Sequence, residues 1–162
     1  MHMRILDTDD SQAWKGAWLA TLMLLALSVS PLATAMDISS PPTGMENTTM
    51  WMTVGEQRFA ISLEDNPATR ELVARVPLNL DMTDLHNNEK YATLEQPLPT
   101  QEYSPGTIQT GDLLLYGSDT LVIFYKTFTS SYSYSRLGHI DNSTGLAEAL
   151  GRKNVRVRFS AD

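Results

Sequence analysis

The sequence contains no cysteine. Disulfide bonds, thiolate catalysis, iron–sulfur clusters and a lipid-modified cysteine are therefore excluded. Small secreted eukaryotic domains usually depend on disulfides, whereas a bacterial periplasmic domain can be stable without them. Any folded domain in this chain is consequently expected to be stable from packing alone.

Basic residues are also few. Lys and Arg number 12 against 19 Asp and Glu, which gives a formal net charge of −7. The one basic cluster is typical of an exposed turn and strand face near the chain end, and consists of Arg152, Lys153, Arg156 and Arg158. Because phosphate contacts dominate affinity for nucleic acids, the acidic balance argues against nucleic acid as a partner.

Patterns that indicate catalysis or cofactor binding are missing. The chain has no phosphate-binding glycine loop, and Ser118-Asp119 lacks the pattern of a nucleophile elbow. His86 and His139 show no helical i, i+4 pairing, so we predict solvated surface histidines rather than metal ligands. The sequence therefore predicts no catalytic residue, no metal site and no cofactor.

The chain has one long hydrophobic run, from Ala17 to Val29. Its length is that of the central region of an export signal, and Pro31 then breaks the helix. Ala33-Thr34-Ala35 offers the small residues that a signal peptidase requires, so residues 1–35 are predicted to be a signal peptide cleaved before Met36. The mature protein would then be periplasmic or secreted.

The alternative for this segment is an uncleaved anchor. Residues 17–35 are near the lower limit of length for crossing a bilayer, and they would hold the chain at the inner membrane. Residues 36–49 contain Pro41, Pro42 and Gly44 without hydrophobic periodicity, and are predicted to be a flexible linker.

Residues 50–162 are predicted to form one domain made mainly of β-strands. Alternation of apolar and polar residues, interrupted by turn signals, predicts strands over residues 50–54, 57–63, 78–82, 89–94, 112–116, 121–125, 132–140 and 155–159. Gly55-Glu56 suits a type II′ hairpin turn, and Gly138 is a candidate for a β-bulge. The residues expected in the core are Phe59, Ile61, Leu113, Leu115, Val122, Phe124, Val157 and Phe159.

Two short helices are expected. Asn66-Pro67 supplies an N-cap and a first-turn proline for a helix over residues 68–76. Ser143 or Thr144 is expected to cap a second helix over residues 145–150, which Gly151 ends. Many short strands with two short helices are typical of a closed barrel or a sandwich.

An ordered set of short motifs spans this domain. The motifs are Asn66-Pro67-Ala68-Thr69, Val76-Pro77-Leu78-Asn79-Leu80, Glu89-Lys90-Tyr91, Gly111-Asp112-Leu113, Val122-Ile123-Phe124-Tyr125-Lys126 and Leu137-Gly138-His139-Ile140. In this order the sequence resembles the bacterial cyclophilin-like domain family. The resemblance implies a closed eight-stranded barrel with two helices over its ends. It does not imply prolyl isomerase activity, because the proline-binding motifs of active cyclophilins are not found here.

The unusual feature of the domain is a stretch rich in aromatic residues. Tyr132, Tyr134 and Arg136 share strand parity and are predicted to project to one face. Tyrosines beside an arginine make good binding surfaces, so these three residues, with Tyr116, Lys126 and Tyr91, form the candidate binding site. The alternative is that the rings fill or cover the barrel, with Arg136 stacked on them. Glu89 and Lys90 are expected to form a surface ion pair or to stabilise a turn.

The sequence therefore predicts an exported, non-catalytic module that binds an unknown peptide, protein or small molecule. The alternative is a divergent peptidyl-prolyl isomerase, which needs only an apolar proline pocket and a cation near the amide, a role for Arg136. A third possibility is a structural domain that holds a partner at the membrane, if the N-terminal segment stays uncleaved.

Overall fold

The computed structural model describes residues 49–162. The predicted signal peptide over residues 1–35 lies outside the described residues, as does the predicted linker except for Thr49. No helix within residues 49–162 is long and apolar enough to span a bilayer.

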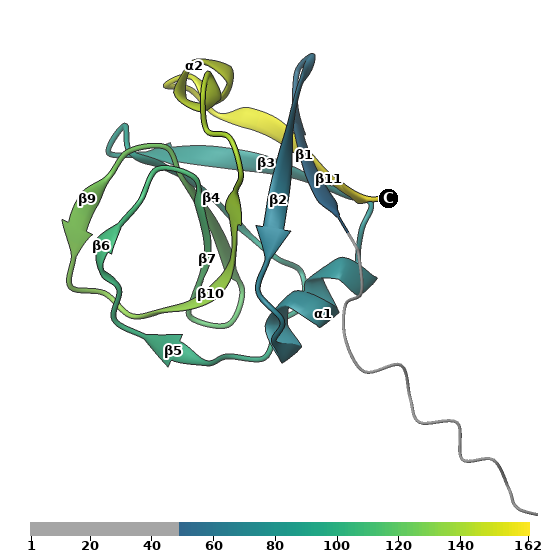
Figure 1. Cartoon of the computed structure of the whole chain (residues 1–162), viewed down its shortest axis with the longest axis vertical. Helices are drawn as coiled ribbons and strands as arrows, with labels where there is room; N and C mark the ends of the chain where they lie inside the picture. The colour runs from purple at the N-terminus through teal and green to yellow at the C-terminus, as the bar shows by residue number, and fades with distance from the viewer. Residues whose placement is uncertain (1–48) are drawn as a thin grey trace, which may run out of the picture. The chain divides into compact units, whose positions relative to one another are not determined.

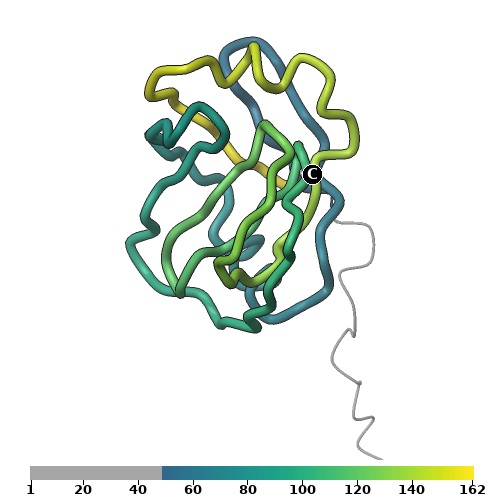
Figure 2. Tube along the Cα trace, turned by 90° about the vertical axis from the view of Figure 1, so that its left-hand side faces the viewer, coloured from purple at the N-terminus to yellow at the C-terminus, as the bar shows by residue number. Residues whose placement is uncertain are grey.

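The sheet is a closed antiparallel barrel of eight strands, which confirms the fold expected from the resemblance (Figure 1). In spatial order the barrel strands are β2 (Gln57–Leu63), β1 (Met50–Val54), β11 (Val155–Ala161), β3 (Leu78–Leu85), β4 (Glu89–Thr93), β8 (Thr120–Phe124), β7 (Asp112–Tyr116) and β10 (Tyr134–Ile140). Strand β10 pairs with β2 and so closes the barrel. The paired residues run from Gly138 opposite Leu63 to Ile140 opposite Ile61. Figure 2 shows the N-terminal strands beside the C-terminal one, in agreement with the β1–β11 pairing.

Strand alternation divides the apolar residues between two clusters. The barrel interior holds Leu113 and Leu115 of β7 with Ile123 of β8. The outer face of the same strands holds Leu114 and Val122. All eight residues predicted for the core are buried. These two strands are thus apolar on both faces, which explains their nearly continuous hydrophobic sequence.

A small two-stranded ribbon covers the outer cluster. It consists of β6 (Gly106–Ile108) and β9 (Phe128–Ser130), and Figure 1 shows it beside the barrel. Ile108 and Phe128 of the ribbon pack on Phe124 and Tyr134 of the barrel. The remaining strand, β5 (Glu102–Tyr103), pairs with the start of β10.

Both helices form close to the predicted positions. Helix α1 (Pro67–Ala74) begins as expected, because the Asn66 side chain accepts a hydrogen bond from the Thr69 backbone N–H at 2.9 Å. Asn66 also donates to the Arg136 carbonyl at 2.8 Å, which ties the helix start to β10. Helix α2 (Leu146–Leu150) has Gly145 at its N-cap and no capping side chain, so the cap predicted at Ser143 or Thr144 is wrong.

Strand β10 is shorter than predicted. It begins at Tyr134, so Tyr132 lies before the strand rather than in it. The predicted bulge is present, since the register with β7 shifts between Arg136 and Gly138. A Cβ at Gly138 would collide with the Ser62 carbonyl oxygen, so only glycine permits this close approach of β10 to β2.

Lys90 is completely buried, and the predicted surface ion pair with Glu89 is wrong. The two residues are consecutive on β4 and point to opposite faces of the sheet. The Lys90 ammonium group contacts Asp84 at 2.6 Å and donates to the Lys153 carbonyl at 2.8 Å. The Tyr125 hydroxyl donates to the same Asp84 carboxylate at 2.5 Å.

This network sets the protonation of its members. Burial alone would raise the pKa of Asp84, but hydrogen bonds from Lys90 and Tyr125 hold it below its ordinary value. Burial, reinforced by the Asp84 carboxylate, raises the pKa of the Tyr125 phenol. Asp84 is therefore ionised at neutral pH, and its charge is compensated inside the fold.

Candidate functional site

A cavity lined by aromatic side chains lies on the outer face of the barrel. Its volume is about 440 Å³, and five barrel strands and the segment around β9 contribute to its wall. We call it the aromatic pocket and define it by Tyr91, Tyr116, Phe128, Tyr132, Tyr134 and the carboxyl-bearing Glu89. Pockets of this size, mostly apolar with few polar groups, are typical of ligand sites in proteins.

The rings form a floor and two walls. Tyr134 is only 4% exposed, and its ring meets that of Phe124 edge-on with 5.7 Å between centroids. Tyr116 and Tyr132 are 47% and 61% exposed, and their ring planes stand at 86° with centroids 6.0 Å apart. Tyr134 therefore belongs to the packed outer cluster, whereas Tyr116 and Tyr132 offer open ring surface.

Glu89 supplies the negative charge of the pocket. It is partly buried, and this burial raises the pKa of its carboxyl group, while nearby His86 acts in the opposite direction. None of the ion pairs among residues 49–162 includes Glu89. The carboxyl group thus faces the rings without a counterion within 4 Å.

The turn between β3 and β4 shapes the rim of the pocket. His86 and Asn87 both have positive φ, +53° and +56°, and Asn88 donates a backbone hydrogen bond to the Leu85 carbonyl. Two successive left-handed residues are the signature of a type I′ turn. The Asn88 side-chain oxygen is buried and has no hydrogen-bond partner within the described part of the chain.

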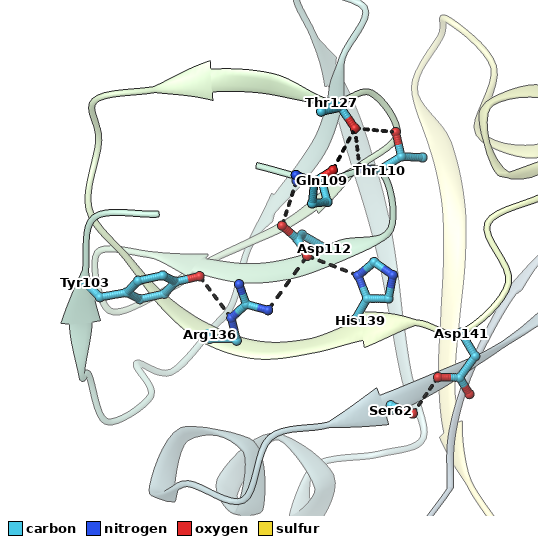
Figure 3. Close-up of polar contacts among 9 residues, drawn as sticks. All are labelled: Ser62, Tyr103, Gln109, Thr110, Asp112, Thr127, Arg136, His139 and Asp141. Atoms are coloured by element: carbon cyan, nitrogen blue, oxygen red, sulfur yellow. Dashed lines mark hydrogen bonds and ion pairs between the residues drawn. The ribbon is translucent and has the colours of Figure 1, made fainter. Parts of the chain in front are cut away.

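A second group of polar side chains surrounds Asp112, further along β7 and β10 (Figure 3). The Asp112 carboxylate is 2% exposed, contacts His139 Nδ1 at 3.1 Å and accepts from the Gln109 backbone N–H at 2.8 Å. Arg136 lies 4.0 Å from the same carboxylate and donates to the Tyr103 hydroxyl at 3.1 Å. The sequence predicted solvated surface histidines. His86 is exposed, as predicted, whereas the His139 side chain is 43% exposed and is also bonded to Asp112.

The Asp112 contacts connect two segments of the barrel. Neither Asp112 nor His139 lines the aromatic pocket or the other large cavity, and their contacts hold the β6–β7 turn against the bulge of β10. Burial would lower the pKa of Arg136, but its bond to Tyr103 and the nearby Asp112 charge raise it. The Arg136 guanidinium group consequently stays charged and bonded to the Tyr103 hydroxyl.

The structure divides the candidate site predicted from the sequence. It brings Tyr91, Tyr116, Tyr132 and Tyr134 together in the aromatic pocket. Arg136 lines a different cavity of about 560 Å³, between the start of α1 and the segment from Pro99 to Tyr103. Lys126 is exposed in the β8–β9 turn and lines neither cavity. Binding at these residues stays a prediction.

Sequence reasoning left two pocket residues out of the site. Phe128 was part of the aromatic stretch, but only its place in the β6–β9 ribbon brings it over the pocket. Glu89 was paired with Lys90, although it shares strand parity with Tyr91, which lies two residues further along β4. That parity was the signal that could have placed Glu89 beside the rings.

A model of the Cyclophilin-like family matches residues 52–160, which is most of the described domain. The chain belongs to the Cyclophilin-like family. No curated protein matches the chain. Family membership agrees with the closed barrel and its two helices, and a shared fold does not by itself assign an activity. Within residues 49–162 no group of three or more His, Asp or Glu side chains could hold a metal ion.

Proposed function

We propose that this cyclophilin-like protein is a non-catalytic binding module whose site is the aromatic pocket. The observation that carries the proposal is the convergence of Tyr116, Tyr132 and Tyr134 around one open cavity of about 440 Å³. Exposed tyrosine rings give large contact area at small cost in side-chain entropy, so they are favoured in binding sites. The occupant is a small molecule or a side chain of a peptide or protein.

The buried ionic groups outside the aromatic pocket support a non-catalytic role, because they are already paired. Lys90 and Asp84 compensate each other inside the fold, and Asp112 is occupied by His139 and the Gln109 backbone. General acid–base catalysis requires a group within hydrogen-bond reach of a substrate, and these groups line neither large cavity.

Prolyl isomerase activity has less support. It would need Arg136 beside an apolar pocket that holds proline. Arg136 instead lines the cavity near α1, apart from the aromatic pocket, and its guanidinium group donates to Tyr103. Turnover of a proline peptide that Arg136→Ala abolishes would make the enzyme the better proposal.

The binding proposal is tested by an NMR titration with a panel of aliphatic and aromatic amines, alcohols and amides. We expect shift changes at the backbone amides of Tyr91, Tyr116 and Phe128. Tyr132→Ala should weaken binding by more than about 1 kcal/mol, as expected for an anchoring ring. Tyr103→Ala is the matched control, because this tyrosine lines the other cavity. Shift changes centred on Tyr103 and Arg136 would contradict the proposal.

We propose further that the mature protein functions outside the cytoplasm. The support is the apolar run from Ala17 to Val29, the small residues before Met36 and the lack of cysteine. N-terminal sequencing of protein from an exporting host is expected to begin at or near Met36. Full-length protein in the membrane fraction would favour the anchor instead.

A further inference from the structure

We infer that the aromatic pocket takes an organic cation, a substituted ammonium group held on the tyrosine ring faces with its charge opposite Glu89. This inference rests on the proposed function, because it names the chemistry of the ligand for the same site. The ammonium group can belong to a free small molecule or to an alkylated lysine side chain, and the chemistry that recognises it is the same.

The charge of Glu89 is not compensated by an ion pair within residues 49–162. Its sequence neighbour Lys90 cannot neutralise it, because Lys90 points to the opposite face and is taken up by Asp84 and the Lys153 carbonyl. The seven ion pairs within residues 49–162 use other carboxylates. A partly buried carboxylate without a partner is unfavourable, so a cationic ligand gains by supplying the missing charge.

The tyrosine rings are also arranged so that they can hold a cation. The centroid of Tyr116 lies 6.0 Å from that of Tyr132 and 5.7 Å from that of Tyr134. A cation is attracted to a ring face within about 6 Å of its centroid, so one ammonium group can contact more than one of these rings. Rings that stand nearly at right angles, as Tyr116 and Tyr132 do, present two sides of a box rather than a flat surface.

The Glu89 carboxylate also acts on the packed floor of the pocket. Burial raises the pKa of the Tyr134 phenol, and Glu89, Tyr116 and Tyr132 add to the rise. Glu89 acts on Tyr134 because its carboxylate is close to that ring, and this negative charge favours a cation nearby. His86 is the one basic residue in the wall, and it is exposed at the rim.

The apolar part of the wall favours a substituted ammonium over a bare one. Leu85 and Val122 line the pocket along with the rings, and Glu89 is its one carboxylate. An unsubstituted ammonium group carries three donors that each need an acceptor, whereas methyl groups on nitrogen pack against rings and aliphatic side chains.

The test uses isothermal titration and NMR on the folded protein with three probes. Choline and Nα-acetyl-Nε-trimethyllysine methylamide carry the cation, and 3,3-dimethyl-1-butanol is the neutral isostere of choline. We expect choline to bind at least about ten-fold more tightly than the isostere, because the cation gains contacts with more than one ring face together with the charge of Glu89. Tighter binding of the lysine derivative than of choline would indicate a protein-borne ligand, and the reverse would indicate a free one.

Variants separate the charge from the rings. Glu89→Gln should weaken choline at least about five-fold and leave the isostere unchanged, whereas Tyr132→Ala should weaken both. Glu148→Gln removes an exposed glutamate of α2 outside the pocket and should change neither affinity.

Three results would overturn the inference. Equal affinity for choline and the isostere, unaffected by Glu89→Gln, would leave the proposed binding function standing with an uncharged ligand. The same conclusion would follow if neutral alcohols or amides of the panel changed the NMR shifts of the pocket amides while neither choline nor the lysine derivative did. A pocket that no cation and no panel member perturbs would reject the proposed function along with the inference.

Discussion

The contrast between Tyr132 and Tyr134 is a quantitative test of the pocket. Tyr134→Ala removes a ring that is 4% exposed and packs on Phe124 and Tyr116. Truncating a buried aromatic residue costs about 3–5 kcal/mol of unfolding free energy. For a domain of this size about 1 kcal/mol corresponds to roughly 4 °C, so the melting temperature should fall by about 12–20 °C.

Tyr132→Ala removes a ring that is 61% exposed and precedes β10. Surface substitutions usually change stability by no more than about 0.5 kcal/mol, so the melting temperature should move by only about 2 °C. Tyr132 therefore separates binding from stability, whereas Tyr134 serves both. Calorimetric melting with urea denaturation of the same variants measures both effects.

Tyr134→Phe is the control, since it keeps the ring in the outer cluster and should lose far less stability than the alanine variant. A Tyr134→Ala protein that melts within about 3 °C of the unmodified protein would refute the packed floor of the pocket. A large loss for Tyr132→Ala would instead show that its ring is part of the packing, and would remove the open wall on which the binding proposal depends.

Other substitutions test the interior and the charge balance. Lys90→Met leaves the Asp84 carboxylate inside the fold without its cation, and urea denaturation should show a loss of about 3–5 kcal/mol. Asp84→Asn added to Lys90→Met should recover part of this loss. Because the folded-state pKa of Glu89 is raised, its contribution to the free energy of unfolding falls as pH rises from the ordinary pKa through the raised one. Glu89→Gln should therefore raise the melting temperature at neutral pH, but not at a pH well below the ordinary pKa of the carboxyl group. Because the pKa of Asp84 is lowered, the stability that it contributes should be lost only as pH falls through that lowered value, and Asp84→Asn should remove this acid dependence. A fragment that starts at Thr49 should fold with the same far-ultraviolet circular dichroism as the longer chain, and failure to fold would show that residues before Thr49 are structural.

Local signals in the sequence were enough to predict most elements of the barrel. Gly55 has φ of +58° while Glu56 does not have positive φ, as the predicted type II′ turn requires. The Asn66 cap and the Gly138 bulge form where they were expected. These features depend on the conformational freedom of single residues or on hydrogen bonds a few positions away, which a sequence displays directly.

The pocket depends on strand order, which no local pattern contains. Tyr91, Tyr116 and Tyr134 meet because β4 and β8, β8 and β7, and β7 and β10 are neighbours in the barrel. Arg136 is separated from Tyr132 and Tyr134 because it lines a different cavity, beside the start of α1. Tertiary pairing alone decides which side chains share a cavity.

The sequence by itself determined that Glu89 and Lys90 lie on opposite faces of one strand, since successive side chains alternate. It could not determine which face is the interior. Strand β8 is the neighbour of β4 in the barrel. One face of β8 packs on the barrel core and the other lies under the β6–β9 ribbon, so both faces are apolar. The usual contrast between a buried face and a solvent-exposed face is therefore absent. Barrel closure and the position of the ribbon decided that Lys90 is buried with Asp84 and that Glu89 faces the rings.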